Sequence, residues 1–236
     1  NMATSERFSE YFGFLDSEVD EIFAVYQKAV KTYGLEQVQV LSPFRLKSDA
    51  GVKNLNQMLR ELANPLLNKT MELSYGSTSF RFGDKVMQTK NTEIASNGDI
   101  GFIAKVDKNN DEVLTVKFSD HRFKTYTIDE LNQLELAYAT TIHKSQGSEY
   151  ECVILPILSS FYVMLQRALI YTAITRAKKK VILVGQKKAL FMAIHKNSSV
   201  KRYTWLGKRI QDAYKKKTEG KKTAMVHTKI PEQLAL

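Results

Sequence analysis

The feature that most constrains the fold is a change of hydrophobic period along the chain. Between about Phe80 and Asp129, apolar and polar residues alternate, and turn signals at residues 97–98 and 108–111 divide this stretch. Before and after it, short continuous apolar runs alternate with segments of helical spacing. Period-two alternation is typical of half-buried antiparallel strands, and continuous apolar strands between helices are typical of a covered parallel sheet. We therefore predict an α/β fold, a parallel sheet flanked by helices with a small antiparallel barrel or sheet inserted between two of its units.

The same patterns predict the individual elements. Residues 17–34 and 51–65 have apolar side chains at helical spacing, and they end at Gly34 and at Asn64-Pro65. The apolar runs VQVLSPF and ECVILPIL are expected to be buried strands. LELAYA is expected to be one strand that leads into a compact turn or helix. Residues 159–180 are expected to form one long helix with Lys178, Lys179 and Lys180 in its solvated last turn, before the strand VILVG and a final helix.

Net charge is the first indication of function. The chain carries 35 Lys+Arg against 25 Asp+Glu, a net charge of +10, and residues 201–236 hold 10 basic but only 3 acidic side chains. Such a tail is suited to nucleic acid phosphates, although a solvated helix end explains it equally well.

The chain also lacks features that would place it elsewhere. Its longest apolar run is far shorter than the roughly 20 residues that cross a bilayer, its N-terminal segment has no signal-peptide pattern, and Cys152 is its single cysteine. We therefore expect a cytoplasmic protein with no membrane partner.

Complete catalytic motifs are missing from the sequence. It contains no GxxxxGK[ST] phosphate loop, no GxSxG elbow and no cluster of metal-ligand residues. Asn1 precedes Met2, so we expect the chain to be a piece of a longer protein and not a complete enzyme.

Two features remain as candidate sites. The turn after the strand LELAYA gathers polar groups that can bind phosphate, sugar or base: Thr140, Thr141, His143, Lys144, Ser145, Gln146, Gly147 and Glu149. An ordinary capped turn is the alternative. Arg176 follows an otherwise apolar helix, where a guanidinium calls for an anionic partner. Its alternatives are a local salt bridge or simple exposure.

Several segments resemble conserved helicase motifs. LAYATTIHKSQGSEYECVILPI and RALIYTAITRAKKKVILVG resemble the last motifs of superfamily 1 helicases. VQVLSPFR, AGVKNLNQMLRELANP, FRFGDKVMQTKN and NGDIGFI resemble the RecD-like branch in particular. The resemblance implies a second RecA-like motor domain (residues 1–74 and 134–205) with an SH3-like barrel insertion (75–133) and a basic tail (206–236).

The resemblance also implies a role for each candidate residue. In such motors ATP and Mg²⁺ bind between two RecA-like domains, the other of which supplies the phosphate loop and the Mg²⁺ ligands, so no metal ligand is expected here. Arg176 would be the arginine finger at the γ-phosphate, and Arg45 a second γ-phosphate contact. Nucleotide contacts would come from Gln146, Gly147 and Glu149, and contacts to single-stranded DNA from Thr140, Thr141, His143, Lys144 and Ser145. Base stacking would come from Tyr138, or from Phe80 and Phe102, for which core packing is the more usual role.

The resulting prediction is the C-terminal motor half of an ATP-dependent DNA helicase that moves 5′ to 3′ on single strands. Its expected partners are single-stranded DNA, duplex junctions, the N-terminal RecA-like domain of the same parent chain, and subunits of a nuclease or repair complex. Its expected location is the bacterial cytoplasm, at the nucleoid. A non-catalytic nucleic-acid-binding module and a structural interaction domain remain as alternatives.

Overall fold

The computed structural model describes residues 14–15, 19–45, 50–66, 71–196, 205 and 207–215. The chain divides into two units, Asn1–Asn197 and Ser198–Leu236, which are considered separately. None of the helices in the described ranges is long and apolar enough to cross a lipid bilayer.

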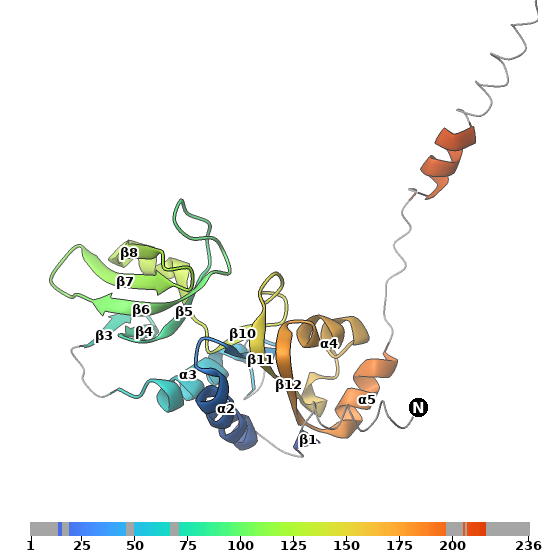
Figure 1. The fold of residues 1–236 in the computed structure, drawn as a ribbon, viewed down its shortest axis with the longest axis horizontal. Coiled ribbons are helices and arrows are strands. Elements are labelled where there is room, and N and C mark those ends of the chain that lie inside the picture. The colour runs from blue at the N-terminus through green and yellow to red at the C-terminus, as the bar shows by residue number, and fades with distance from the viewer. Residues whose placement is uncertain are drawn as a thin grey trace, which may run out of the picture. The chain divides into compact units, whose positions relative to one another are not determined.

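A five-stranded parallel sheet is the base of the first unit (Figure 1). Its strands, in spatial order, are β1 (Phe14–Leu15), β12 (Ala177–Gly185), β11 (Tyr150–Ile157), β2 (Val38–Ser42) and β10 (Ala139–Thr141). All five residues of β2 are buried, as expected for a strand covered on both faces.

Helices cover the parallel sheet. Helix α2 (Val19–Tyr33) packs against β2 and β11, and α3 (Val52–Ala63) packs against β10 and α2. Helix α4 (Arg167–Ile174) packs against β11, β12 and α5 (Lys187–His195), and the short 3-10 helix η3 (Ser159–Phe161) precedes α4. Continuous apolar strands bury their side chains under these helices, which is why the sequence pattern predicts a parallel sheet.

The antiparallel insertion lies in the chain between α3 and β10. Its main sheet has the order β8 (Phe123–Thr127), β7 (Glu112–Phe118), β6 (Ile100–Val106), β5 (Lys85–Gln88) and β9 (Leu134–Leu136). The hairpin of β3 (Glu72–Tyr75) and β4 (Thr78–Arg81) contacts β6, and the 3-10 helix η2 (Ile128–Gln133) precedes β9. The insertion has its own apolar core, which includes Phe80, Ile103, Val116 and Phe118. The prediction of an α/β fold with an antiparallel insertion is confirmed, whereas the exact division at residues 74, 133 and 205 stays a prediction.

Three expectations about single elements were wrong. The long helix of residues 159–180 is broken, because α4 spans only Arg167–Ile174. Lys178, Lys179 and Lys180 belong to strand β12 and not to a helical turn, since β12 pairs with β11 from Ala177 onward. LELAYA is two strands, because β9 pairs with β5 of the insertion and β10 pairs with β2 of the parallel sheet.

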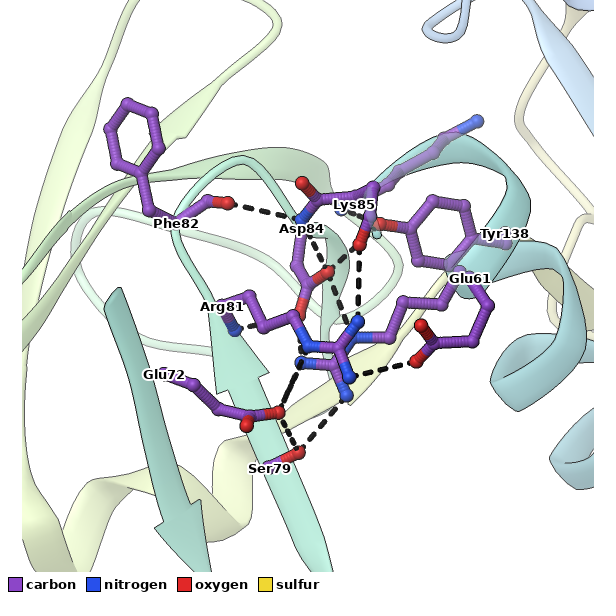
Figure 2. A network of polar contacts seen from close by, with 10 residues as sticks. Glu61, Glu72, Ser79, Arg81, Phe82, Asp84, Lys85 and Tyr138 are labelled. Atoms are coloured by element: carbon purple, nitrogen blue, oxygen red, sulfur yellow. Dashed lines mark hydrogen bonds and ion pairs between the residues drawn. The ribbon is translucent and has the colours of Figure 1, made fainter. Parts of the chain in front are cut away.

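A buried polar network joins the insertion to the helix that precedes it (Figure 2). At its centre, the fully buried carboxylate of Asp84 accepts hydrogen bonds from Arg60 Nε at 3.0 Å, Asn64 Nδ2 at 2.8 Å and the Tyr138 hydroxyl at 2.9 Å. The backbone N–H of Arg81 donates to the same carboxylate at 2.7 Å. Because these groups come from α3 and its C-terminal cap, from β4 and from the residue that precedes β10, the network fixes the insertion against the parallel-sheet part.

Candidate functional site

The polar turn after β10 leads from the carboxyl ends of the parallel strands to their amino ends. These two ends are called the carboxyl edge and the amino edge of the sheet. Strand β10 ends at the carboxyl end of β2, since Thr141 pairs with Ser42. Strand β11 begins at the amino edge, where Tyr150 pairs with Ala177 at the start of β12. Residues 142–149 connect the two edges in a series of tight turns. The candidate residues therefore fall into two groups rather than one site.

The first group lies at the carboxyl edge of β2 and β10. Arg45 and Lys144 both bind the carboxylate of Glu135, with Arg45 Nη2 at 2.6 Å from Oε1 and Lys144 Nζ at 2.8 Å from Oε2. Thr141 Oγ1 accepts a hydrogen bond from the backbone N–H of Lys144 at 3.2 Å. The structure thus brings Arg45 together with the predicted DNA-binding residues Thr141 and Lys144. It does not bring Arg45 to Arg176, which lies at the other edge.

Two of the predicted DNA contacts have buried side chains. Thr140 is 3% exposed, and Ser145 is fully buried and donates its hydroxyl to the Ile142 carbonyl at 2.8 Å. The Ser145 hydroxyl supports the turn, and neither hydroxyl is accessible to a strand in this structure, whereas His143 is exposed. Of the candidates for base stacking, Tyr138 and Phe80 are also buried, because Tyr138 belongs to the Asp84 network and Phe80 to the core of the insertion.

The second group lies at the amino edge of β11 and β12. The Arg176 guanidinium donates to the Ser148 carbonyl at 3.2 Å, the Thr172 carbonyl at 3.3 Å and the Thr175 hydroxyl at 3.3 Å. No carboxylate among the described residues forms an ion pair with it, so the alternative of a local salt bridge for Arg176 finds no support in that part of the chain. These neutral acceptors orient the guanidinium, and its charge is left without a carboxylate partner among the described residues.

Glu149 belongs to the second group, whereas Gln146 and Gly147 lie in the turn between the two groups. All three are exposed, and Gly147 has a φ of +91°, a left-handed conformation that favours glycine. Glu149 lies 3.7 Å from Lys178, and both line a cavity of about 300 Å³ that is shared with the insertion. The charged lining of that cavity is four carboxylates (Glu36, Asp99, Asp120 and Glu149) and two cations (Arg122 and Lys178). Since carboxylates outnumber cations there, the cavity is poorly suited to a triphosphate, and Arg176 does not line it.

A groove opens at the first group, between α3, β9 and the turn of the β3–β4 hairpin. Its main cavity has a volume of about 490 Å³ and a smaller one continues it toward Thr141 and Lys144, with Arg45, Val52, Glu135 and Leu136 lining both. Lys53, Gln57 and Thr78 line the main cavity, and so do Arg60 of the Asp84 network and Ser79. Apart from Glu135, the groove combines cations with neutral hydrogen-bonding groups, which is typical of a surface that binds phosphates.

Thiol and metal chemistry find no support in the described ranges. Cys152 is buried, and burial raises the pKa of its thiol to about 11, so it is protonated at neutral pH. Among the residues that the structure describes, no group of three or more His, Cys, Asp or Glu side chains could hold a metal ion.

Sequence reasoning missed Glu135, which binds two of the predicted site residues at once. Its position within LELAYA predicts only a place in a strand that leads into the parallel sheet. The switch of the chain from the insertion sheet to the parallel sheet, at residues 137–138, places Glu135 beside Arg45 and Lys144. No local sequence signal marks such a switch.

Comparison with known families gives two matches. Residues 136–184 match the UvrD-like helicase C-terminal domain, and residues 55–118 match the SH3 domain of ATP-dependent RecD-like DNA helicases. The first match covers the turn after β10 and Arg176, and the second covers most of α3 and much of the insertion.

Curated relatives agree with these matches. The chain is 39% identical over 155 residues to the ATP-dependent RecD2 DNA helicase of Deinococcus radiodurans, covering 64% of this chain and 20% of that protein. It is 31% identical over 192 residues to the RecBCD enzyme subunit RecD of Haemophilus influenzae, covering 79% of this chain and 27% of that protein. The chain thus spans between a fifth and about a quarter of the length of these relatives. Among solved structures, a crystal structure of Bacteroides Pif1 bound to ssDNA matches 86% of this chain and 55% of its own, with 17% identity and a TM-score of 0.46.

Proposed function

Since this chain belongs to the RecD-like family of superfamily 1 helicases and corresponds to its C-terminal region, we propose that it couples ATP hydrolysis to movement on single-stranded DNA. It would supply the arginine finger and part of the DNA grip. The N-terminal RecA-like domain of the parent chain would supply the phosphate loop and the Mg²⁺ ligands. Four further parts of this proposal depend on the family alone. They are movement from 5′ to 3′, duplex junctions as substrates, a nuclease or repair complex as assembly partner, and a location in the bacterial cytoplasm at the nucleoid.

One observation carries the proposal. Residues 142–149 connect the edge that bears Thr141 and Lys144 to the edge where Ser148 holds the Arg176 guanidinium. A shift of this short segment on hydrolysis would move the residues at both edges. Hydrolysis of the nucleotide would therefore change the contacts to a bound DNA strand. Gln146 and Gly147 lie within this segment and Glu149 lies at its end, and their contacts to nucleotide stay predictions.

The proposed role of Arg176 follows from its charge and its neutral contacts. During phosphoryl transfer, negative charge spreads over the γ-phosphate oxygens and the leaving oxygen. A guanidinium placed across the cleft stabilises that charge, and such arginine fingers typically accelerate hydrolysis by about 10³ to 10⁵. The neutral carbonyl and hydroxyl acceptors hold the guanidinium without competing for its charge. Lysine lacks the planar fork that reaches two oxygens at once.

The test is Arg176→Ala in the full-length parent protein, measured by ATP hydrolysis in the presence of oligothymidylate and by oligothymidylate affinity. We expect hydrolysis to fall by about 10³ or more and DNA affinity to stay nearly unchanged, with Arg176→Lys almost as defective. Arg167→Ala is the matched control, since the Arg167 Nε donates to the Ile194 carbonyl at 2.8 Å and so is directed toward α5.

An equal loss of hydrolysis and DNA affinity would contradict the finger role. Unchanged hydrolysis would favour a nucleic-acid-binding module in which the parallel sheet is only a scaffold. The 236-residue chain alone should hydrolyse ATP negligibly, because its sequence contains no phosphate loop.

A further inference from the structure

The groove between α3 and β9 is cationic except for one carboxylate. Among the described residues that line its two cavities, the charged side chains are Arg45, Lys53, Arg60, Lys144 and Glu135. Arg60 is bound to the buried Asp84, with 2.7 Å between its Nη2 and Oδ2. Glu135 alone provides negative charge among the described residues that line the open part of the groove.

Glu135 holds its two cations in the way that a phosphate group would. Each of its carboxylate oxygens binds a different cation, Arg45 at 2.6 Å and Lys144 at 2.8 Å. A phosphodiester carries the same single charge and also has two free oxygens, and arginine recognises both groups with similar geometry. The carboxylate thus occupies the position in which a backbone phosphate would bind both cations.

The exposure of these groups makes exchange feasible. The Arg45 side chain is 62% exposed, and those of Glu135 and Lys144 are 36% and 34% exposed. Ion pairs this accessible to water stabilise a protein weakly, so an incoming phosphate loses little by displacing Glu135.

We propose that Glu135 is an internal stand-in for phosphate, which the backbone of a single-stranded nucleic acid displaces from Arg45 and Lys144. The strand would then run along the groove past Lys53 and Gln57 toward the β3–β4 turn. Glu135 belongs to the last strand of the insertion and Lys144 to the turn after β10, so displacement also releases the insertion from that turn. This inference rests on the proposed function, because it takes single-stranded nucleic acid as the ligand, and it moves Arg45 from the nucleotide to the strand.

The test compares oligothymidylate affinity of the 236-residue chain and its Glu135→Gln variant by fluorescence anisotropy. Glutamine keeps the size of the side chain, removes the charge that competes with phosphate and leaves one acceptor oxygen in place of two. We expect the variant to bind about three- to tenfold more tightly, the equivalent of releasing two exposed ion pairs. In an Arg45→Ala/Lys144→Ala background the same substitution should give no gain, because no cation is left to release.

Asp107→Asn is the matched control, because it also removes one carboxylate of the insertion, paired with Lys105 at 3.1 Å and outside the groove. Its affinity should equal that of the original chain. An equal gain in both variants would reduce the effect to net charge and overturn the proposal. A gain for ATP without a gain for oligothymidylate would assign the two cations to nucleotide and overturn it as well.

The same measurement separates this inference from the proposed function. If the original chain binds oligothymidylate and Glu135→Gln binds it equally well, the stand-in role is wrong and the DNA-binding function stands. If neither protein binds oligothymidylate, both proposals fail.

Discussion

At the scale of single residues, Lys85 has an unusual environment for a lysine. Its side chain is fully buried, and its Nζ lies within 3.0–3.2 Å of the carbonyl oxygens of Leu35 and Val38 and of Gln39 Oε1. Burial lowers the pKa of Lys85 from 10.5 to about 7, although these oxygens favour the ammonium form. A strand of the insertion thus places a titratable group under the first residues of β2.

This environment predicts a pH-dependent stability. The folded state releases the Lys85 proton near pH 7, whereas the unfolded chain keeps it up to about 10.5. Between these values the unfolded state binds more protons, so the free energy of unfolding rises with pH, by at most about 1.4 kcal/mol per pH unit. We expect the stability of the original chain relative to Lys85→Met to increase from pH 7 to 9, as measured by urea unfolding.

The exposed Lys187 provides the comparison for this measurement, since Lys187→Met should leave the pH dependence unaltered. A relative stability of Lys85→Met that does not vary with pH would mean that the carbonyl oxygens keep Lys85 charged throughout.

At the scale of elements, a network of ion pairs connects α3, the β3–β4 hairpin and the residue that precedes β5. Arg60 of α3 reaches both Asp84 and Glu72, and Arg81 of β4 binds Glu72 at 2.9 Å and Glu61 of α3 at 2.7 Å (Figure 2). Together with the Ser79 hydroxyl, the two arginines lower the pKa of Glu72 against the opposing effect of its partial burial. Removing one member leaves buried charges without partners, which costs more than the intact network contributes.

Asp84→Asn is expected to destabilise the chain by roughly 3 to 5 kcal/mol, because Arg60 loses its buried carboxylate and Tyr138 and Asn64 lose a charged acceptor. Thermal unfolding of the variant would measure this loss. Asp111→Asn, in the exposed loop between β6 and β7, should melt with the original chain. A melting temperature unchanged by Asp84→Asn would show that the network does not hold the insertion in place.

At the scale of the whole molecule, the C-terminal unit carries much of the excess positive charge. Residues 207–215 form a helix there, with Trp205, Ile210 and Tyr214 exposed and the Lys208 ammonium 4.8 Å from the centre of the Trp205 ring. The remainder of the predicted tail lies outside the described residues. Its role in binding phosphates therefore stays a prediction from charge alone.

That role has a direct measurement in the salt dependence of oligothymidylate binding. Deletion of residues 206–236 should flatten the plot of log affinity against log salt by about 0.7 for each phosphate that the tail neutralises. Replacing Lys215, Lys216 and Lys217 with arginine should preserve the slope, and replacing them with glutamine should flatten it. If the slope is the same after the deletion, the tail does not bind phosphates and is a solvated helix end.

The sequence by itself determined the fold class, and it predicted which residues could carry chemistry. Hydrophobic period records which side of an element is buried, so it separated the parallel sheet from the insertion. Polar side chains within an apolar pattern identified Arg176 and the turn after β10. Both kinds of signal are local, because each depends on neighbours within a few positions of the chain.

Only the tertiary structure decided which of these residues meet. Strand pairing divides LELAYA between two sheets and so brings Glu135 to Arg45 and Lys144. The same pairing places Arg176 at the opposite edge and draws Lys178, Lys179 and Lys180 into β12. Burial removes Thr140 and Ser145 from the accessible surface. Such outcomes depend on hydrogen bonds between segments far apart in sequence, which no local pattern encodes.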